Sequence, residues 1–199
     1  MKRSLCSLAL LAAAACGGAD NVVVRASLGE GQPVADLPVR LIPYDRQAIL
    51  DSLARDAESP EPRLPADAME RLRTLQAEAE RVKPQGDSAV ARAVAARNAY
   101  VAQLDSIRTA RAKWLEDRRE DFEAAAEERN REGLVEVADT TDATGRASVA
   151  ADAGRWWAVA RYVLPDQVLE WYVPVRVRED RDSVVVRLDR ANAKSEPFF

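Results

Sequence analysis

The chain contains no histidine, and only two cysteines and eight glycines occur among its 199 residues. Histidine is a common general base and metal ligand, so its absence excludes Ser-His-Asp and Cys-His catalysis and histidine-based zinc sites. Basic residues are not in excess, because 33 acidic residues outnumber 29 basic ones and the formal charge is −4. A chain without a basic excess is poorly suited to neutralise phosphates, so we expect no nucleic-acid partner.

The rest of the composition is that of a folded protein without a catalytic motif. Hydrophobic residues make up 47% of the chain and charged residues 31%, and the length suits one domain with an elaboration. There is neither a nucleophile elbow nor a phosphate-binding loop. Asp139, Asp142 and Asp152 lie near expected turns, but their spacing fits no EF-hand loop, and Asp142 is placed to shape a turn. We expect no enzyme activity, no metal and no cofactor.

The first residues have the composition of an export signal. Lys2 and Arg3 form a positive head, and residues 4–15 are an uncharged run rich in leucine and alanine. A charged head, a short apolar run and small residues at the cleavage point are typical of a secretory signal peptide, which we place at residues 1–15. The run is shorter than the roughly 20 apolar residues that span a bilayer, so it does not predict a permanent transmembrane helix.

Residues 13–16, Ala-Ala-Ala-Cys, resemble the lipobox of bacterial lipoproteins. The resemblance implies that Cys16 becomes the first mature residue and carries acyl chains that attach the protein to a membrane, with residues 16–20 as a tether. Gly17 replaces the aspartate that favours inner-membrane retention in enteric bacteria, which implies an outer-membrane location facing the periplasm. The alternative is ordinary signal cleavage after Ala15 or Ala19, which would release a soluble secreted protein.

Two separate parts of the chain have the pattern of β-structure. Residues 21–44 and 133–190 are rich in valine, tryptophan, tyrosine and leucine, and turn-forming clusters separate short runs. In the first run Val22, Val24 and Ala26 share one face at a period of two. The expected strands are residues 22–28, 37–43, 134–137, 146–150, 156–164, 168–177 and 183–188. Seven short strands at this spacing are typical of an antiparallel β-sandwich.

Three motifs in these parts resemble transthyretin-like, carboxypeptidase regulatory-like modules. Residues 31–41 are similar to the Gly-x-Pro-hydrophobic turn that leads into the second strand of such modules. Residues 141–149 are similar to their Thr-Asp-x-x-Gly-x-hydrophobic hairpin, and residues 154–159 are similar to the Gly-x-Tyr strand that follows. The resemblance implies a prealbumin-like sandwich formed by residues 21–44 and 133–190. It implies no activity, because members of the family have many functions.

Residues 45–132, which separate the two β-rich parts, have a helical pattern and are rich in alanine, arginine and glutamate. We expect one helix from Asp87 to about Arg131, roughly 65 Å long, that packs against shorter helices before it. Its expected apolar seam is Val90, Val94, Val101, Leu104, Trp114 or Leu115, and Phe122. The predicted class is therefore α+β, with a coiled-coil-like helical hairpin inserted into the sandwich, and residues 191–199 form a C-terminal tail.

Two pairs of neighbouring aromatic residues are the candidate binding surface. Trp156 and Trp157 lie side by side on one expected strand, and Trp171 and Tyr172 lie on the next. Neighbouring side chains of a strand point to opposite faces, so one residue of each pair lies outside the sandwich core. An outward pair of this size needs either a cover, such as the helical hairpin, or a ligand, such as a sugar or a partner peptide.

Together these observations predict a lipid-anchored cell-envelope protein without catalytic activity. A long amphipathic projection favours a protein-interaction or structural role, with the hairpin or its root as the contact surface. The alternative is a carbohydrate- or peptidoglycan-binding module that uses the outward aromatic residues. Besides the membrane, the expected partner is therefore an envelope protein or a glycan.

Overall fold

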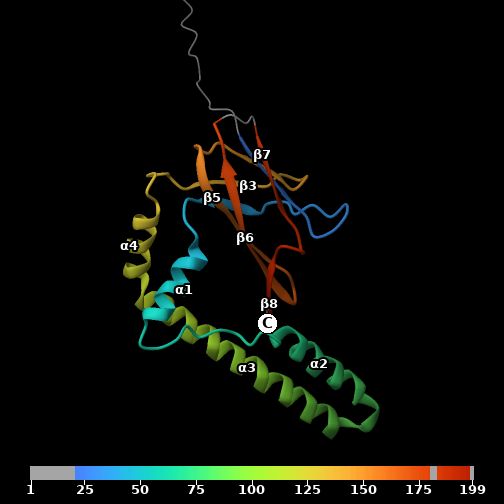
Figure 1. Cartoon of the computed structure of the whole chain (residues 1–199). Coiled ribbons are helices and arrows are strands. Elements are labelled where there is room, and N and C mark those ends of the chain that lie inside the picture. The colour runs from blue at the N-terminus through green and yellow to red at the C-terminus, as the bar shows by residue number, and fades with distance from the viewer. Residues whose placement is uncertain (1–20, 180–182, 198–199) are drawn as a thin grey trace, which may run out of the picture.

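The structure is a computed structural model that describes residues 21–179 and 183–197. The predicted signal peptide at residues 1–15, the predicted lipid-bearing Cys16 and the tether lie outside the described residues. Within the described part the chain is α+β, as its pattern predicts, with eight strands in two sheets and four α-helices. Along the sequence, all four α-helices come after the second strand and before the third (Figure 1).

Both sheets join strands that the helices separate in sequence. One sheet has the strand order β4-β1-β7, and the other has the order β3-β2-β5-β6-β8. The strands are β1 (Val22–Ala26), β2 (Pro38–Ile42), β3 (Val137–Thr140), β4 (Arg146–Val149), β5 (Gly154–Val163), β6 (Gln167–Val177), β7 (Val184–Leu188) and β8 (Lys194–Pro197). Every pair of neighbours in the five-stranded sheet is antiparallel, whereas β1 pairs antiparallel with β4 and parallel with β7.

The expectation of seven antiparallel strands is therefore wrong in two respects. Residues 194–197, expected in a tail, form an eighth strand, β8, which pairs with residues 167–170 of β6. In addition, β7 runs parallel to β1. The tail carries no alternation of apolar and polar residues that would reveal a strand. The direction of pairing depends on how the chain crosses between the sheets, which local periodicity does not record.

One hydrophobic core lies between the two sheets. Val24 of β1, Val39 of β2 and Val149 of β4 belong to a single buried cluster. Its largest members are the two tryptophans Trp156 and Trp171, whose exposure is 1% and 0%. The segments before and after the helices therefore share one interior, in which burial of apolar area supplies the main stabilisation.

Two motifs about a hundred residues apart in sequence meet beside this core. The buried Thr141 hydroxyl donates to the carbonyl oxygen of Val34 at 2.7 Å and accepts from the amide of Leu37 at 2.9 Å. The carbonyl oxygen of Gly145 accepts from the amide of Ala26 at 2.8 Å. Gly145 has a φ of +73°, and a Cβ there would lie 2.4 Å from the Ala26 oxygen. Only glycine therefore allows this turn to approach β1 so closely.

The helical segment, residues 45–132, forms two helix pairs. The helices are α1 (Arg46–Asp56), α2 (Ala68–Arg81), the 3₁₀ helix η1 (Lys83–Gln85), α3 (Asp87–Asp117) and α4 (Arg119–Arg129). α2 and α3 pack against each other through Leu72, Tyr100 and Leu104, and α1 packs against α4. We call the first pair the α2–α3 hairpin.

The expectation of one helix from Asp87 to about Arg131 is wrong, because the chain bends at Arg118, between α3 and α4. No proline or glycine marks this break, and the turn there directs α4 to pack on α1, a contact that local sequence does not show. The expected seam is only partly correct. Leu104 and Trp114 are buried, whereas Val94 is 39% exposed and Tyr100 takes part in the buried seam.

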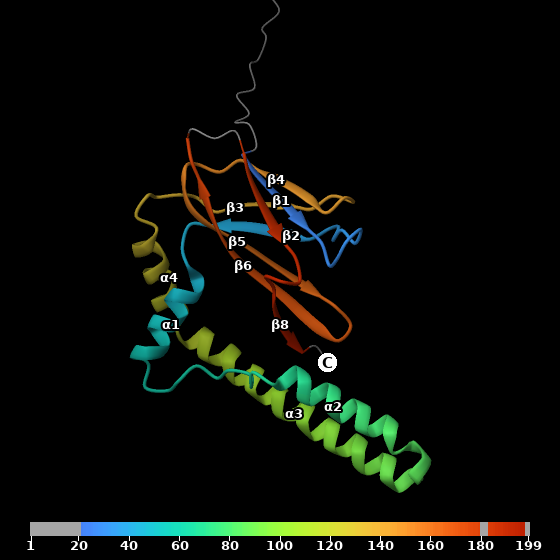
Figure 2. The same cartoon turned by 45° about the vertical axis from the view of Figure 1, so that its right-hand side comes forward.

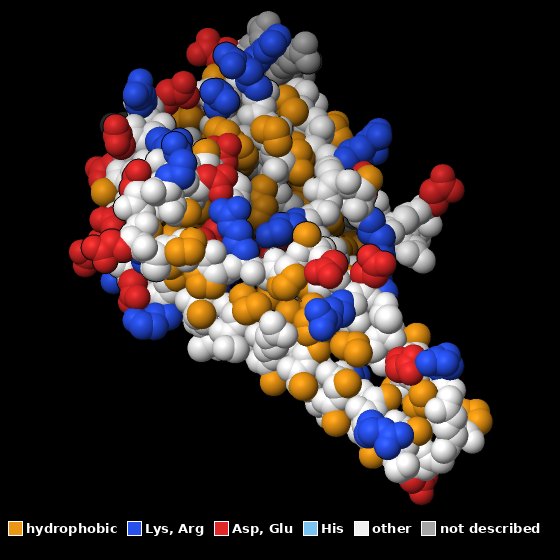
Figure 3. All heavy atoms as spheres, turned by 60° about the horizontal axis from the view of Figure 1, so that its bottom comes forward, with side chains coloured by type: hydrophobic (Ala, Val, Ile, Leu, Met, Phe, Trp, Pro, Cys, Tyr) orange, Lys and Arg blue, Asp and Glu red, His pale blue; other side chains and the backbone are white. Residues whose placement is uncertain are grey.

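The α2–α3 hairpin projects from the sheets at the end of the molecule opposite to the start of β1 (Figures 1 and 2). The space-filling view in Figure 3 shows this projection extending from the body, with hydrophobic side chains spread along it. Within the described residues, no helix is both long and apolar enough to cross a membrane.

Candidate functional site

A cavity of about 830 Å³ lies between the outer face of the five-stranded sheet and the helical segment. We call it the interlayer cavity. β5, β6 and β8 form one wall, while the start of α1, the linker between α1 and α2, the start of α2 and one residue of α3 form the other. Its volume is within the range of about 300–1,000 Å³ that is usual for small-ligand sites.

The sheet side of the interlayer cavity is aromatic. Trp157 on β5 and Tyr172 on β6 point outward from the core, and both line the cavity together with Pro174. The antiparallel register places Trp157 directly opposite Pro174. This neighbourhood arises because outward residues on adjacent strands lie side by side on one face of the sheet.

The other two candidate aromatics, Trp156 and Trp171, are core residues, so their assignment to a binding surface is wrong. The indole Nε1–H of Trp156 donates to the carbonyl oxygen of Asp152 at 2.9 Å. That of Trp171 donates to the carbonyl oxygen of Asp189 at 2.8 Å. Alternation along a strand predicts that one residue of each pair is buried, but it does not say which one faces the second sheet.

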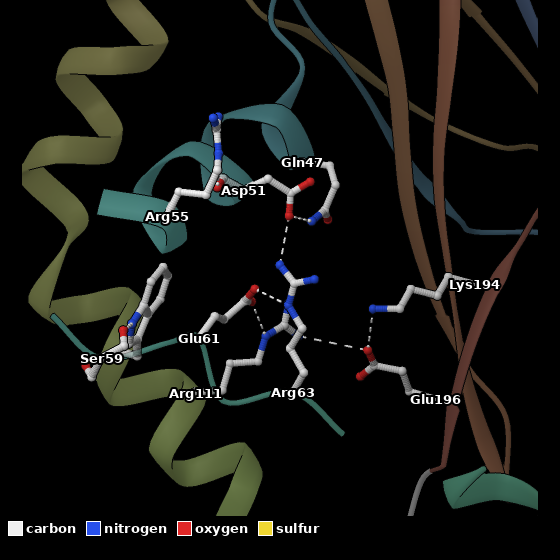
Figure 4. Close-up of polar contacts among 10 residues, drawn as sticks. Gln47, Asp51, Arg55, Ser59, Glu61, Arg63, Arg111, Lys194 and Glu196 are labelled. Atoms are coloured by element: carbon white, nitrogen blue, oxygen red, sulfur yellow. Dashed lines mark hydrogen bonds and ion pairs between the residues drawn. The ribbon is translucent and has the colours of Figure 1, made fainter. Parts of the chain in front are cut away.

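The helical side of the cavity is built around a buried carboxylate. The side chain of Glu61, in the linker between α1 and α2, is only 2% exposed. Its Oε2 lies 2.8 Å from Nε of Arg63, and its Oε1 lies 2.9 Å from Nε of Arg111 on α3 (Figure 4). Two charge-assisted hydrogen bonds therefore compensate the burial of this carboxylate.

The ion pairs continue outward from Glu61 in both directions. Arg63 also binds Asp51 of α1 through its Nη2 at 2.8 Å. Nη1 of Arg111 lies 3.9 Å from Oε1 of Glu196 on β8, and the same oxygen lies 2.9 Å from Nζ of Lys194. We call these six residues the ion-pair chain, and Figure 4 shows that it runs from α1 to the sheet. It therefore links the two walls of the cavity.

Three ionisable side chains of this region have shifted pKa values. The hydrogen bond from Arg63 holds the pKa of Asp51 below its usual value, and Asp51, followed by Glu61, raises the pKa of Arg63. Burial raises the pKa of Tyr172 above its usual value of 10.0, so its hydroxyl stays protonated. The cavity thus offers guanidinium donors, carboxylate acceptors and aromatic faces, a set that suits a polar organic ligand or a peptide.

The chain matches no family model, curated protein or solved structure with which we compared it.

Asp139, Asp142 and Asp152, whose spacing fits no EF-hand loop, do not form a metal site in the described part of the chain. Oδ1 of Asp142 accepts from the amide and hydroxyl of Thr144 at 2.8 and 2.7 Å, which shapes the turn. Oδ2 of Asp139 accepts from the amide of Ser148 at 2.9 Å. Among residues 21–179 and 183–197, no group of three or more acidic or cysteine side chains is arranged to hold a metal ion.

The sequence patterns did not predict the charged half of the cavity. Glu61 stands between Pro60 and Pro62, where the prolines indicate only a break between helices. Arg111 looks like any other arginine on a charged helix. Neither residue carries a local signal that it meets the other, because their contact bridges 50 positions and depends on the packing of the linker against α3.

Proposed function

We propose that this chain is a non-catalytic protein-interaction module of the cell envelope, with the α2–α3 hairpin as its contact surface. The position of the hairpin carries the proposal, because it projects from the sheets at the end opposite to the start of β1. With the lipid anchor that residues 13–16 predict at Cys16, the membrane lies at one end and the hairpin reaches away from it. A projection of this kind suits contact with another envelope component.

A non-catalytic role agrees with the chemistry of the interlayer cavity. Glu61 and Glu196 are both engaged by cations, so neither is placed as a free general acid or base. Asp45, which also lines the cavity, caps α1 by accepting from the amide of Ala48 at 3.0 Å. The chain also contains no histidine that could take that role. The cavity is therefore better suited to binding than to proton transfer.

We also propose that the two sheets are a transthyretin-like module that the helical segment interrupts. Support comes from the contacts between the motifs that carry the resemblance. Thr141, which opens the second motif, bonds to Val34 and Leu37 of the first. An outer-membrane location facing the periplasm remains part of the same proposal.

Shortening the hairpin tests the interaction role. Gln76 and Arg97 line the same small pocket, so a short glycine-containing turn can join α2 to α3 there in place of the residues between them. The buried contact of Leu72 with Tyr100 lies outside the deleted part. We expect partners cross-linked to the full chain in envelope extracts to be lost from this variant. A Val185→Thr variant, altered on the exposed face of β7, should retain them.

Capture of every partner by the shortened variant would contradict the interaction role. Circular dichroism and thermal melting should first show that both variants are folded. The comparison then reports on the projecting tip alone, because the shortened variant retains the sheets, α1, α4 and the root of the hairpin.

A second candidate function is binding of a glycan in the interlayer cavity. Trp157 and Tyr172 favour it, because aromatic faces beside charged hydrogen-bonding groups are suited to sugar rings and their hydroxyls. We expect Trp157→Ala to reduce sedimentation of the protein with insoluble peptidoglycan. Val159→Ala is the matched control, since Val159 lies on the same face of β5 but does not line the cavity. Equal sedimentation of both variants would exclude this function for the cavity.

A further inference from the structure

A second hollow, of about 380 Å³, lies on the helical segment and shares no lining residue with the interlayer cavity. We call it the helix groove. α1, the last turns of α3 and the first turn of α4 form it, and the bend at Arg118 brings these three helices around one space. Its apolar lining consists of Leu50, Leu53, Ala112, Trp114, Leu115 and Phe122. The groove therefore offers an apolar floor that is partly open to solvent.

Two arginines border this floor and lie on its aromatic rings. The guanidinium carbon of Arg118 is 4.4 Å from the centre of a Trp114 ring. That of Arg46 is 5.7 Å from the centre of the Phe122 ring. Such cation–π contacts hold a guanidinium in place over one face and leave its edge N–H groups able to donate.

Neither of these two arginines has a carboxylate within ion-pair distance among the residues that the structure describes. Arg119, which also borders the groove, differs, because it pairs with Glu116 at 3.5 Å and with Glu123 at 3.3 Å. Glu116 also lines the groove, and its ion pair with Arg119 offsets its charge. Arg46 additionally lies in the first turn of α1, where the helix dipole disfavours a cation. In a chain with a net charge of −4, two positioned guanidiniums beside an apolar floor are complementary to an acidic ligand.

We propose that the helix groove binds an acidic segment of a partner protein. One or two apolar side chains of the segment enter the groove, and its carboxylates pair with Arg46 and Arg118. A volume of about 380 Å³ is close to the lower end of the range for ligand sites, so it accommodates a few side chains. The proposal rests on the interaction role above and adds a second contact, at the helix groove, together with the chemistry of the segment that binds there.

Selection of peptides provides the test. Random twelve-residue peptides displayed on phage are selected on the full chain, and those that also bind a Leu53→Asp variant are discarded. We expect the enriched peptides to combine Asp or Glu with Leu, Phe or Trp. Fluorescence anisotropy of a labelled enriched peptide should show about tenfold weaker binding for Arg46→Gln and again for Arg118→Gln. Arg55→Gln is the matched control, because Arg55 is an exposed arginine of α1 that does not line the groove.

Three results would overturn the proposal. The first is that the enriched peptides lack acidic residues. The second is that Arg46→Gln and Arg118→Gln bind the peptide with unchanged affinity. The third is that the full chain self-associates in sedimentation velocity and that Leu53→Asp abolishes this association. The last result would assign the groove to a second copy of the chain. The hairpin-shortened variant separates this test from that of the proposed function. It retains the groove, so it should bind the peptide normally even where it no longer captures an envelope partner.

Discussion

Replacement of Glu61 by glutamine tests whether the ion-pair chain holds the helical segment against the sheet. Glutamine has nearly the same shape, so the change removes the charge without creating a large cavity. In the native protein Glu61 accepts from Arg63 at 2.8 Å and from Arg111 at 2.9 Å while its side chain is only 2% exposed. The amide oxygen can still accept from one guanidinium, but the amide nitrogen would face the N–H groups of the other.

The size of the effect follows from the exposure of the partners. Removing one member of a fully buried ion pair costs about 3–5 kcal/mol. The side chain of Arg63 is 57% exposed and that of Arg111 is 26% exposed, so water compensates part of the loss. Arg63 also keeps Asp51 as a partner. We therefore expect the free energy of unfolding to fall by about 2–3 kcal/mol, which is roughly one charge-assisted hydrogen bond.

Thermal and urea denaturation followed by circular dichroism measure this change. For a chain of this size the expected fall in Tm is about 4–12 °C, at about 2–4 °C for each kcal/mol. Glu58→Gln is the control, because Glu58 is exposed and lies in the same linker. Denaturation midpoints that are equal for the two variants would refute the reasoning, since burial of the Glu61 carboxylate between two arginines would then contribute nothing.

Three further substitutions test the fold. Gly145→Ala should lower the free energy of unfolding, measured by urea denaturation, by about 3 kcal/mol or more. The reasons are that residue 145 has a positive φ and that a Cβ there would lie 2.4 Å from the Ala26 oxygen. A change under about 1 kcal/mol would contradict this. Hydrogen bonds from Thr144 hold the pKa of Asp142 below 3.8, so its contribution to stability is present above that pH and is lost as the pH falls through the lowered pKa. On acidification below about pH 4, the Tm of Asp142→Asn should therefore fall by less than the Tm of the native chain. Equal falls would contradict a stabilising role for the Asp142 carboxylate. Leu104→Ala should cost about 3 kcal/mol and increase amide exchange in α2 and α3, because Leu104 is 0% exposed between them; protection equal to that of the native chain would exclude this packing.

Much of the secondary structure could be predicted, because it depends on local periodicity. The alternation of Val22, Val24 and Ala26 corresponds to β1, and the Ala- and Arg-rich middle corresponds to the four α-helices. β8 could not be predicted in this way, because its four residues form a strand only through their pairing with β6. The bend at Arg118 was missed for a similar reason, since it depends on the contact of α4 with α1.

The candidate site shows the same division between local and long-range information. Strand alternation implies that one member of each aromatic pair is outward, and the structure assigns this position to Trp157 and Tyr172. The choice depends on which face of the sheet meets the second sheet. Glu61 and Arg111 become a site only when the linker packs on α3, so no local pattern could single them out.

By itself, the amino-acid sequence determined the α+β class, the exclusion of histidine chemistry and the approximate places of most strands and helices. Each of these follows from residue type and from spacing over a few positions. The tertiary structure alone decided which aromatic residues are buried, which charges meet, and where the interlayer cavity and the helix groove lie. The physical reason is that burial and ion pairing depend on distances between segments up to about a hundred residues apart, and packing sets those distances.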